Sequence, residues 1–211
     1  MVRKTLLALA GGLALALVPA APALAADTTP TVEHVQIKSE MTAKSLETYG
    51  QFKLKNLKTG ETASLAAVAP PGGGCRYPVG FNGIASYTNG ALTSVTLDYE
   101  AQAICTVTGP DQYMAGMVVT ASMWRDGTHL GEGPSVNCVN CVVTPISRGY
   151  YACGGVTCAG GYWAGNIHAL KAPPGYVWPS APAGCIGLGT APYEWIQCST
   201  VTDVAVVSPT N

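Results

Sequence analysis

The sequence predicts an all-β protein, an antiparallel sandwich of immunoglobulin-like or related Greek-key type that is stapled by disulfides. Short segments of alternating apolar and polar residues are separated by turn signals every ten residues or so. No helical period persists for more than about two turns. The chain of 211 residues also carries eight cysteines and only 11% charged residues, which is typical of exported β proteins.

Two dipeptides mark tight hairpin turns, because Asn-Gly and Asp-Gly tolerate the positive φ angles that such turns need. Asn89-Gly90 predicts the cross-strand pairs Ile84 with Val95 and Tyr87 with Leu92. The strand that follows alternates, and its predicted core face comprises Val95, Leu97, Tyr99, Ala101, Ala103, Cys105 and Val107. Asp126-Gly127 predicts a second hairpin, with Trp124 beside His129 on the face opposite Val119, Ala121 and Met123.

Residues 1–25 are predicted to be a Sec-type signal peptide that directs export of the chain. Arg3 and Lys4 precede an apolar run from residue 5 to 18, and Ala23-Leu24-Ala25 supplies small residues for cleavage after Ala25. The run is shorter than the roughly 20 residues that span a bilayer, so we expect a secreted protein of 186 residues without a membrane span. Removal of Arg3 and Lys4 lowers the basic count from 11 to 9 against 12 acids. This balance argues against nucleic acid as a partner.

The remaining chain divides into three parts. Residues 26–69 hold many charges and no cysteine, and their alternation predicts an N-terminal hairpin with its turn at Lys58–Glu61; a removable pro-segment is the alternative. Residues 70–74, rich in proline and glycine, predict a linker. Residues 75–211 form the predicted disulfide-rich β domain, with further strands expected at 161–171, 175–178 and 200–207.

An even number of cysteines in an exported chain predicts four disulfides. Sequence order suggests Cys75 with Cys105, Cys138 with Cys141, Cys153 with Cys158, and Cys185 with Cys198. Two alternatives remain open. The spacing of Cys138, Cys141, Cys153 and Cys158 would suit a four-thiolate zinc site, and Cys138-Val-Asn-Cys141 a thiol oxidoreductase. The predicted signal peptide favours disulfides, because exported proteins fold in an oxidising environment. No metal and no cofactor is therefore expected.

Catalytic motifs are missing from the sequence: it contains no G-x-S-x-G elbow, no H-E-x-x-H and no P-loop. Asp98 and Glu100 lie two residues apart on one predicted strand, which is more typical of a solvated sheet face than of a glycosidase pair. The aromatic residues are the stronger signal. Exported sandwiches bind ligands through exposed aromatic faces, and the candidate binding residues are Trp124, His129, Trp163 and Trp178.

The segments G-Y-Y-A-C, Y-W-A-G and P-P-G-Y-V-W, together with the signal and the low charge, resemble small exported cysteine-containing β-sandwich proteins of actinobacteria. The resemblance implies no particular activity. We therefore expect a non-enzymatic binding or surface-interaction module whose partner is an extracellular protein or carbohydrate. The alternative is a secreted hydrolase, or a hydrolase inhibitor that acts through the region from Cys138 to Cys158.

Overall fold

The computed structural model describes residues 29–41, 52–65, 74–106 and 113–211. These residues form strands and one 3-10 turn, η1 (Val156–Cys158). The strand pairings are antiparallel throughout, so the predicted all-β antiparallel architecture is confirmed. The predicted signal peptide and residues 70–73 of the predicted linker lie outside the described residues.

Four strands form one of the two large sheets, in the order β1 (Val32–Glu40), β5 (Val79–Thr88), β6 (Ala91–Ala101) and β11 (Ser147–Gly154). Strand β1 pairs along its whole length with β5, from Val32 opposite Thr88 to Glu40 opposite Gly80. The first strand of the charged N-terminal segment is therefore an edge strand of a sheet built mainly from the later part of the chain.

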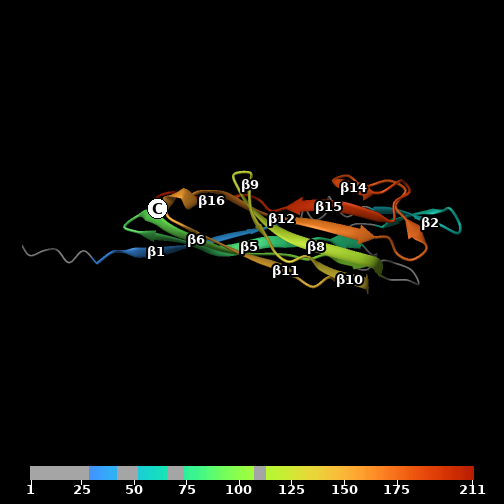
Figure 1. Ribbon diagram of the computed structural model, residues 1–211, viewed down its shortest axis with the longest axis horizontal. Helices are drawn as coiled ribbons and strands as arrows, with labels where there is room; N and C mark the ends of the chain where they lie inside the picture. The colour runs from blue at the N-terminus through green and yellow to red at the C-terminus, as the bar shows by residue number, and fades with distance from the viewer. Residues whose placement is uncertain (1–28, 42–51, 66–73, 107–112) are drawn as a thin grey trace, which may run out of the picture.

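Seven strands form the other large sheet, which runs in the order β10, β8, β12, β15, β14. Strand β9 pairs with β8, and β16 pairs with β12. Their bounds are β8 (Met114–Arg125), β9 (Thr128–Glu132), β10 (Val136–Cys141), β12 (Gly160–Lys171), β14 (Cys185–Leu188), β15 (Trp195–Val201) and β16 (Ala205–Val207). Figure 1 shows the long strands of both sheets running along the length of the molecule.

Two small sheets complete the fold. The predicted N-terminal hairpin consists of β2 (Phe52–Asn56) and β3 (Thr62–Leu65), and β13 (Tyr176–Val177) pairs with β2. Strand β4 (Gly74–Arg76) pairs with β7 (Ile104–Thr106), and this pairing sets Cys75 opposite Cys105.

Both predicted hairpin turns are present, with φ at Asn89, Gly90, Asp126 and Gly127 between 48° and 80°. Tyr87 pairs with Leu92 as predicted, but Ile84 pairs with Thr96 rather than with Val95. The register shifts between Ser86 and Tyr87, because a β-bulge there adds one residue to the partner strand β6. A bulge of this kind cannot be predicted from the sequence, because apolar and polar residues continue to alternate on either side of it.

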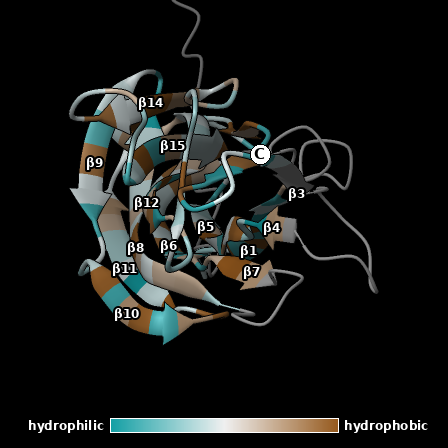
Figure 2. Cartoon of the chain, turned by 90° about the vertical axis from the view of Figure 1, so that its right-hand side faces the viewer, coloured by the Kyte–Doolittle hydropathy of each residue, from teal (hydrophilic) through white to brown (hydrophobic). Residues whose placement is uncertain are grey.

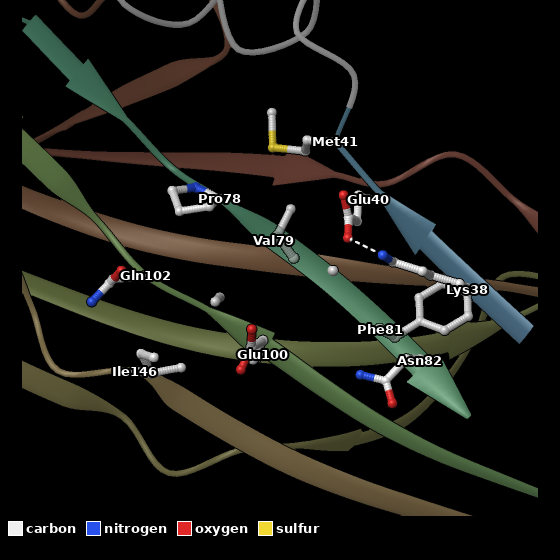
Figure 3. Close-up of a pocket in the computed structure, with 12 residues that line it drawn as sticks. Lys38, Glu40, Met41, Pro78, Val79, Phe81, Asn82, Glu100, Gln102 and Ile146 are labelled. Carbon is white, nitrogen blue, oxygen red and sulfur yellow. Dashed lines mark ion pairs between the residues drawn. The ribbon is translucent and has the colours of Figure 1, made fainter.

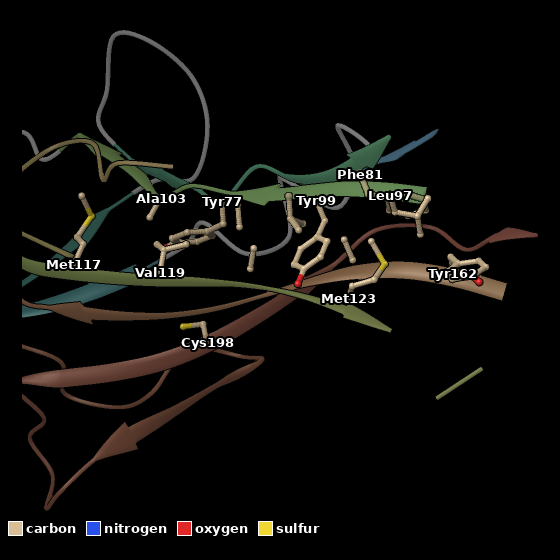
Figure 4. Close-up of a cluster of buried hydrophobic side chains, with 14 of the residues drawn as sticks. Tyr77, Phe81, Leu97, Tyr99, Ala103, Met117, Val119, Met123, Tyr162 and Cys198 are labelled. Atoms are coloured by element: carbon tan, nitrogen blue, oxygen red, sulfur yellow. The ribbon is translucent and has the colours of Figure 1, made fainter. Parts of the chain in front are cut away.

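The core lies between the two large sheets. Figure 4 shows Leu97 and Tyr99 of one sheet pointing toward the other sheet, with Met123 of the other sheet close to the Tyr99 ring. The predicted core face is buried from Val95 to Cys105, with 2% exposure or less at each alternate residue, while Val107 lies outside the described residues. One face of each large sheet is therefore covered by the other large sheet.

All four disulfides join the pairs expected from sequence order: Cys75–Cys105, Cys138–Cys141, Cys153–Cys158 and Cys185–Cys198. No free cysteine remains, so the four thiolates that the zinc alternative needs are bonded in disulfides. The oxidoreductase alternative lacks the helix N-terminus that would lower a thiol pKa, because Cys138 and Cys141 lie within strand β10 (Val136–Cys141). Cys185 and Cys198 lie directly opposite each other on β14 and β15. The bridges therefore fasten neighbouring strands or the two ends of a single short segment.

The last residues of the chain close against the β5–β6 turn. Leu92 N donates to Pro209 O at 3.0 Å, and Asn211 N donates to Gly90 O at 3.0 Å. Thr210 forms a bridge with Ala91, and the Tyr87 hydroxyl donates to Ser208 O at 3.1 Å. Figure 1 accordingly shows the C-terminus beside the turn at which β6 begins. We call residues 208–211 the C-terminal strap.

Candidate functional site

Three of the four predicted binding residues meet on the outer face of the seven-stranded sheet. Trp124 of β8 lies directly opposite Trp163 of β12, and His129 of β9 lies opposite Trp124. The two indole rings are stacked, with centroids 5.0 Å apart and planes 1° apart, and the His129 ring is 4.7 Å from that of Trp124. Both tryptophans are half-buried. We call Trp124, Trp163 and His129 the aromatic cluster.

A glycine beneath the rings allows them to lie over the sheet. A Cβ at Gly165 would lie 3.4 Å from the Trp163 ring, 3.6 Å from Trp124 Nε1 and 2.9 Å from the Ser122 hydroxyl. Trp124 Nε1 donates to that hydroxyl at 3.2 Å, and Ser122 is 3% exposed beneath the rings. The absence of a side chain at Gly165 and the hydrogen bond to Ser122 therefore fix the orientation of the Trp124 indole.

The three strands that carry most of this face have few charges on it. Along β8, β12 and β15, alternation places a single charged side chain, Lys171, on the outer face. Near the cluster this face carries exposed aliphatic residues and hydroxyl groups. The aliphatic residues are Ile167, Val201, Val204 and Val206.

Polar groups lie at the side of the cluster. The Thr120 and Ser135 hydroxyls are 2.6 Å apart, and Glu132 Oε1 is 3.6 Å from His129 Nε2. The arrangement can combine stacking and apolar contact with hydrogen bonds to an uncharged ligand.

A further aromatic residue lies at the other end of the same face. Trp195 of β15 pairs with Lys171 of β12, whose ammonium is 5.9 Å from the indole centroid. The ring lies over Gly116, where a Cβ would be 2.9 Å from it. Trp195 was not among the four predicted binding residues. The alternation from Trp195 to Val201, with Ile196, Cys198 and Thr200 buried, is the sequence signal that places Trp195 on the outer face.

Trp178 is a core residue. Its side chain is 0% exposed, and its backbone pairs with Tyr193 through hydrogen bonds of 2.8 Å in both directions. An exposed aromatic face cannot include it, so its prediction as a ligand-binding residue is corrected. It follows a two-residue strand between two prolines, Pro174 and Pro179, and such a stretch has too little alternation to indicate a face.

The three histidines lie apart, in three different settings. His129 belongs to the aromatic cluster. His34 Nδ1 is 3.0 Å from the Ser86 hydroxyl in an exposed cross-strand pair on the four-stranded sheet. His168 is 1% exposed, stacks on Tyr77 with ring centroids 3.6 Å apart, and has its Nδ1 3.2 Å from Asn166 Oδ1. Burial lowers the pKa of His168 to about 3, so it is a neutral core residue at neutral pH.

The four-stranded sheet carries a polar hollow of about 340 Å³ on its outer face. Glu40, Gly80 and Glu100 occupy one row across β1, β5 and β6, and Figure 3 shows the two carboxylates on either side of β5. Glu40 pairs with Lys38 at 2.7 Å, and Glu100 pairs with Arg148 at 3.2 Å. A glycosidase acid needs burial to keep its proton near neutral pH, but both carboxylate side chains are more than half exposed.

The region from Cys138 to Cys158 is not one bridged loop. The Cys138–Cys141 disulfide lies within β10, the Cys153–Cys158 disulfide joins β11 to η1, and residues 142–146 connect the two large sheets. This connection is tied to the β6–β7 junction. Cys105 N donates to Val142 O at 2.7 Å, and Thr144 N donates to Ala103 O at 2.9 Å.

In the part of the chain that the structure describes, no helix has the length and apolar character that a bilayer crossing requires. Within the same residues, histidine, cysteine and acidic side chains do not gather in threes where a metal ion could be held. The chain matches no known protein-family model, no curated protein and no solved structure. Four disulfides fit an extracellular protein.

Proposed function

We propose that this protein is a non-enzymatic extracellular binding module that holds an uncharged ligand against the aromatic cluster. The observation that supports this proposal is the stacked, half-buried Trp124–Trp163 pair on an open sheet face with a single charged side chain along β8, β12 and β15. Aromatic side chains that are buried belong to the core. A stacked pair on a solvent-facing sheet instead leaves apolar surface in contact with water, which is unfavourable, and a bound ligand can cover that surface.

A neutral carbohydrate fits this chemistry best. The C–H faces of a sugar ring are apolar and pack on indole, while its hydroxyl groups need donors and acceptors beside the ring. Glu132, His129, and the Thr120 and Ser135 hydroxyls supply these groups next to the cluster. An anionic ligand is disfavoured, because the Glu132 carboxylate lies 3.6 Å from His129 Nε2.

The test is binding of the secreted protein to an array of neutral oligosaccharides, followed by titration calorimetry on the positive sugars. Trp124→Ala and Trp163→Ala are each expected to weaken binding at least tenfold, because truncation of a central aromatic anchor removes most of its contact energy. Tyr150→Ala is the matched control. Tyr150 is 62% exposed but lies on the outer face of the other sheet.

Two results would contradict the proposal. One is turnover of a substrate by the purified protein with no ligand bound at the cluster. The other is binding that Trp124→Ala and Trp163→Ala leave unchanged. Binding of a protein instead of a sugar, with the same dependence on both tryptophans, would support the binding role of the aromatic cluster but contradict a carbohydrate as its ligand.

A further inference from the structure

The end of β10 and the connection from it to β11 expose aliphatic side chains on a fixed backbone. Val139 is 74% exposed, Val142 39%, Val143 43% and Ile146 39%. No charged residue occurs from Asn137 to Ser147. Folded proteins rarely leave several neighbouring aliphatic side chains in water, and such groups mark contact sites for other molecules. We call residues 139–146 the apolar loop.

The apolar loop is held rigidly from both sides. The Cys138–Cys141 disulfide fixes its start, and Ser147 at its end donates to Pro134 O at 2.8 Å. Thr144 is bonded through three of its polar atoms, since its hydroxyl accepts from Ala103 N at 3.0 Å and its carbonyl accepts from Gln102 Nε2 at 2.8 Å, besides the Thr144 N bond. A backbone fixed in this way loses little conformational entropy on binding, which favours its use in recognition.

The apolar loop adjoins the polar hollow. Ile146 lines the hollow together with Glu40, Gly80, Glu100 and Gln102, and Figure 3 shows Ile146 beside Glu100. The floor of the hollow is Gly80, where a Cβ would lie 3.2 Å from Ser39 O, so the space between the carboxylates depends on a missing side chain. The Cα atoms of Glu40 and Glu100 are two strand spacings apart, about 10 Å.

The hollow is suited to a cationic side chain. Its lining contains two carboxylates, those of Glu40 and Glu100, but only one ammonium group, that of Lys38. Their present partners, Lys38 and Arg148, form exposed ion pairs of a kind that contributes little to stability, so a cation from outside can replace them at small cost. Met41 and Ile146 offer apolar contact to the stem of a long side chain.

From these features we propose that the polar hollow and the apolar loop together dock a protein segment that carries a lysine or arginine flanked by aliphatic residues. The basic side chain enters between Glu40 and Glu100, and the aliphatic residues cover Val142, Val143 and Ile146. A lipid surface is disfavoured, because no basic residue lies in the apolar loop to meet anionic head groups, and Arg148 beside it is paired. This surface is separate from the aromatic cluster and does not depend on its function.

The experiment is selection of a random 12-residue peptide library on the full disulfide-bonded protein, with the enriched peptides synthesised and titrated by calorimetry. We expect the enriched peptides to share a lysine or arginine between aliphatic residues. Replacement of that basic residue by norleucine should weaken binding at least tenfold. Glu100→Gln and Ile146→Glu in the protein should each do the same.

Two matched variants control for general effects. Val206→Glu places the same new charge on an exposed aliphatic residue of the seven-stranded sheet, and Trp124→Ala removes the aromatic cluster; both are expected to bind the peptides normally. Thermal unfolding checks that each variant is folded, and a second loop variant, Val143→Glu, replaces Ile146→Glu if that one is not. Enriched peptides without a basic residue, peptides that bind all variants equally, or no enrichment over an unrelated disulfide-bonded protein would overturn the proposal.

Discussion

The burial of His168 is expected to make the stability of the fold sensitive to acid. Its imidazole is surrounded by core residues, and its Nε2 has no hydrogen-bond partner among the described residues, so desolvation lowers its pKa to about 3. In the unfolded chain the pKa of histidine is about 6.5. The unfolded state therefore takes up the proton first as the pH falls. The stability that neutral His168 contributes is present above about pH 6.5 and is lost as the pH falls toward about 3.

His168→Phe removes this titration while keeping an aromatic ring against Tyr77. We expect the free energy of unfolding of the variant to fall less steeply between pH 6.5 and pH 4, by about 1 kcal/mol per pH unit relative to the wild type. Urea unfolding at several pH values measures the slope. His34→Phe is the control, because it replaces an exposed histidine on the four-stranded sheet in the same way. Equal slopes for His168→Phe and the wild type would show that His168 does not govern acid stability.

Gly149 is the second residue with a specific prediction, because the Tyr99 ring crosses directly over it. A Cβ at Gly149 would lie 2.2 Å to 2.4 Å from atoms of that ring. Gly149→Ala must displace a buried tyrosine, so we expect it to lower the free energy of unfolding by about 1–3 kcal/mol. Gly154→Ala on the same strand is the control, since nothing lies within 4 Å of its Cβ position. Denaturant titration of both variants checks the difference, and equal stabilities would contradict it.

At the scale of strands and turns, the local features could be predicted from sequence and the long-range ones could not. The turn at Asp126-Gly127 fixes Trp124 beside His129, because hairpin partners follow from counting back from the turn. The stacking of Trp163 on Trp124 joins strands that are distant in the chain, and alternation does not say which strands become neighbours. The hollow likewise needs β1, β5 and β6 side by side, together with Gly80 between two glutamates.

The disulfides differ in how much of the unfolded chain they restrict. Cys75 and Cys105 are 30 residues apart in sequence, whereas Cys138 and Cys141 are only 3 apart. The entropy of loop closure predicts a loss of about 3–4 kcal/mol for the double variant of Cys75 and Cys105 to alanine, and about 1–2 kcal/mol for that of Cys138 and Cys141. Urea unfolding of the two double variants measures the order. The reverse order would mean that the Cys138–Cys141 disulfide stabilises the native apolar loop more than it restricts the unfolded chain.

For the whole molecule, covalent state and export can be checked together by intact mass. We expect no cysteine of the secreted protein to react with a thiol reagent before reduction and all eight to react afterwards. The same spectrum should give a chain that begins at Ala26, as cleavage after Ala25 predicts. Labelling of Cys138 or Cys141 without reduction would contradict the closed β10 bridge, and a mass that includes residues 1–25 would contradict the predicted cleavage.

The molecule offers two outer faces of different chemistry. The seven-stranded sheet exposes tryptophan and aliphatic residues with few charges, and the four-stranded sheet exposes ion pairs and a hollow. Figure 2 shows hydrophilic and hydrophobic bands alternating along β10 and β11, the strands that the apolar loop joins. Since each face has its own proposed ligand, one molecule can hold both at the same time.

The C-terminal strap bears on how the protein withstands degradation. A protease needs its substrate segment in an extended and unbonded form, but Asn211 and Pro209 are hydrogen-bonded to the β5–β6 turn. Cleavage within the strap must wait until those bonds open, so its rate depends on how often the strap opens.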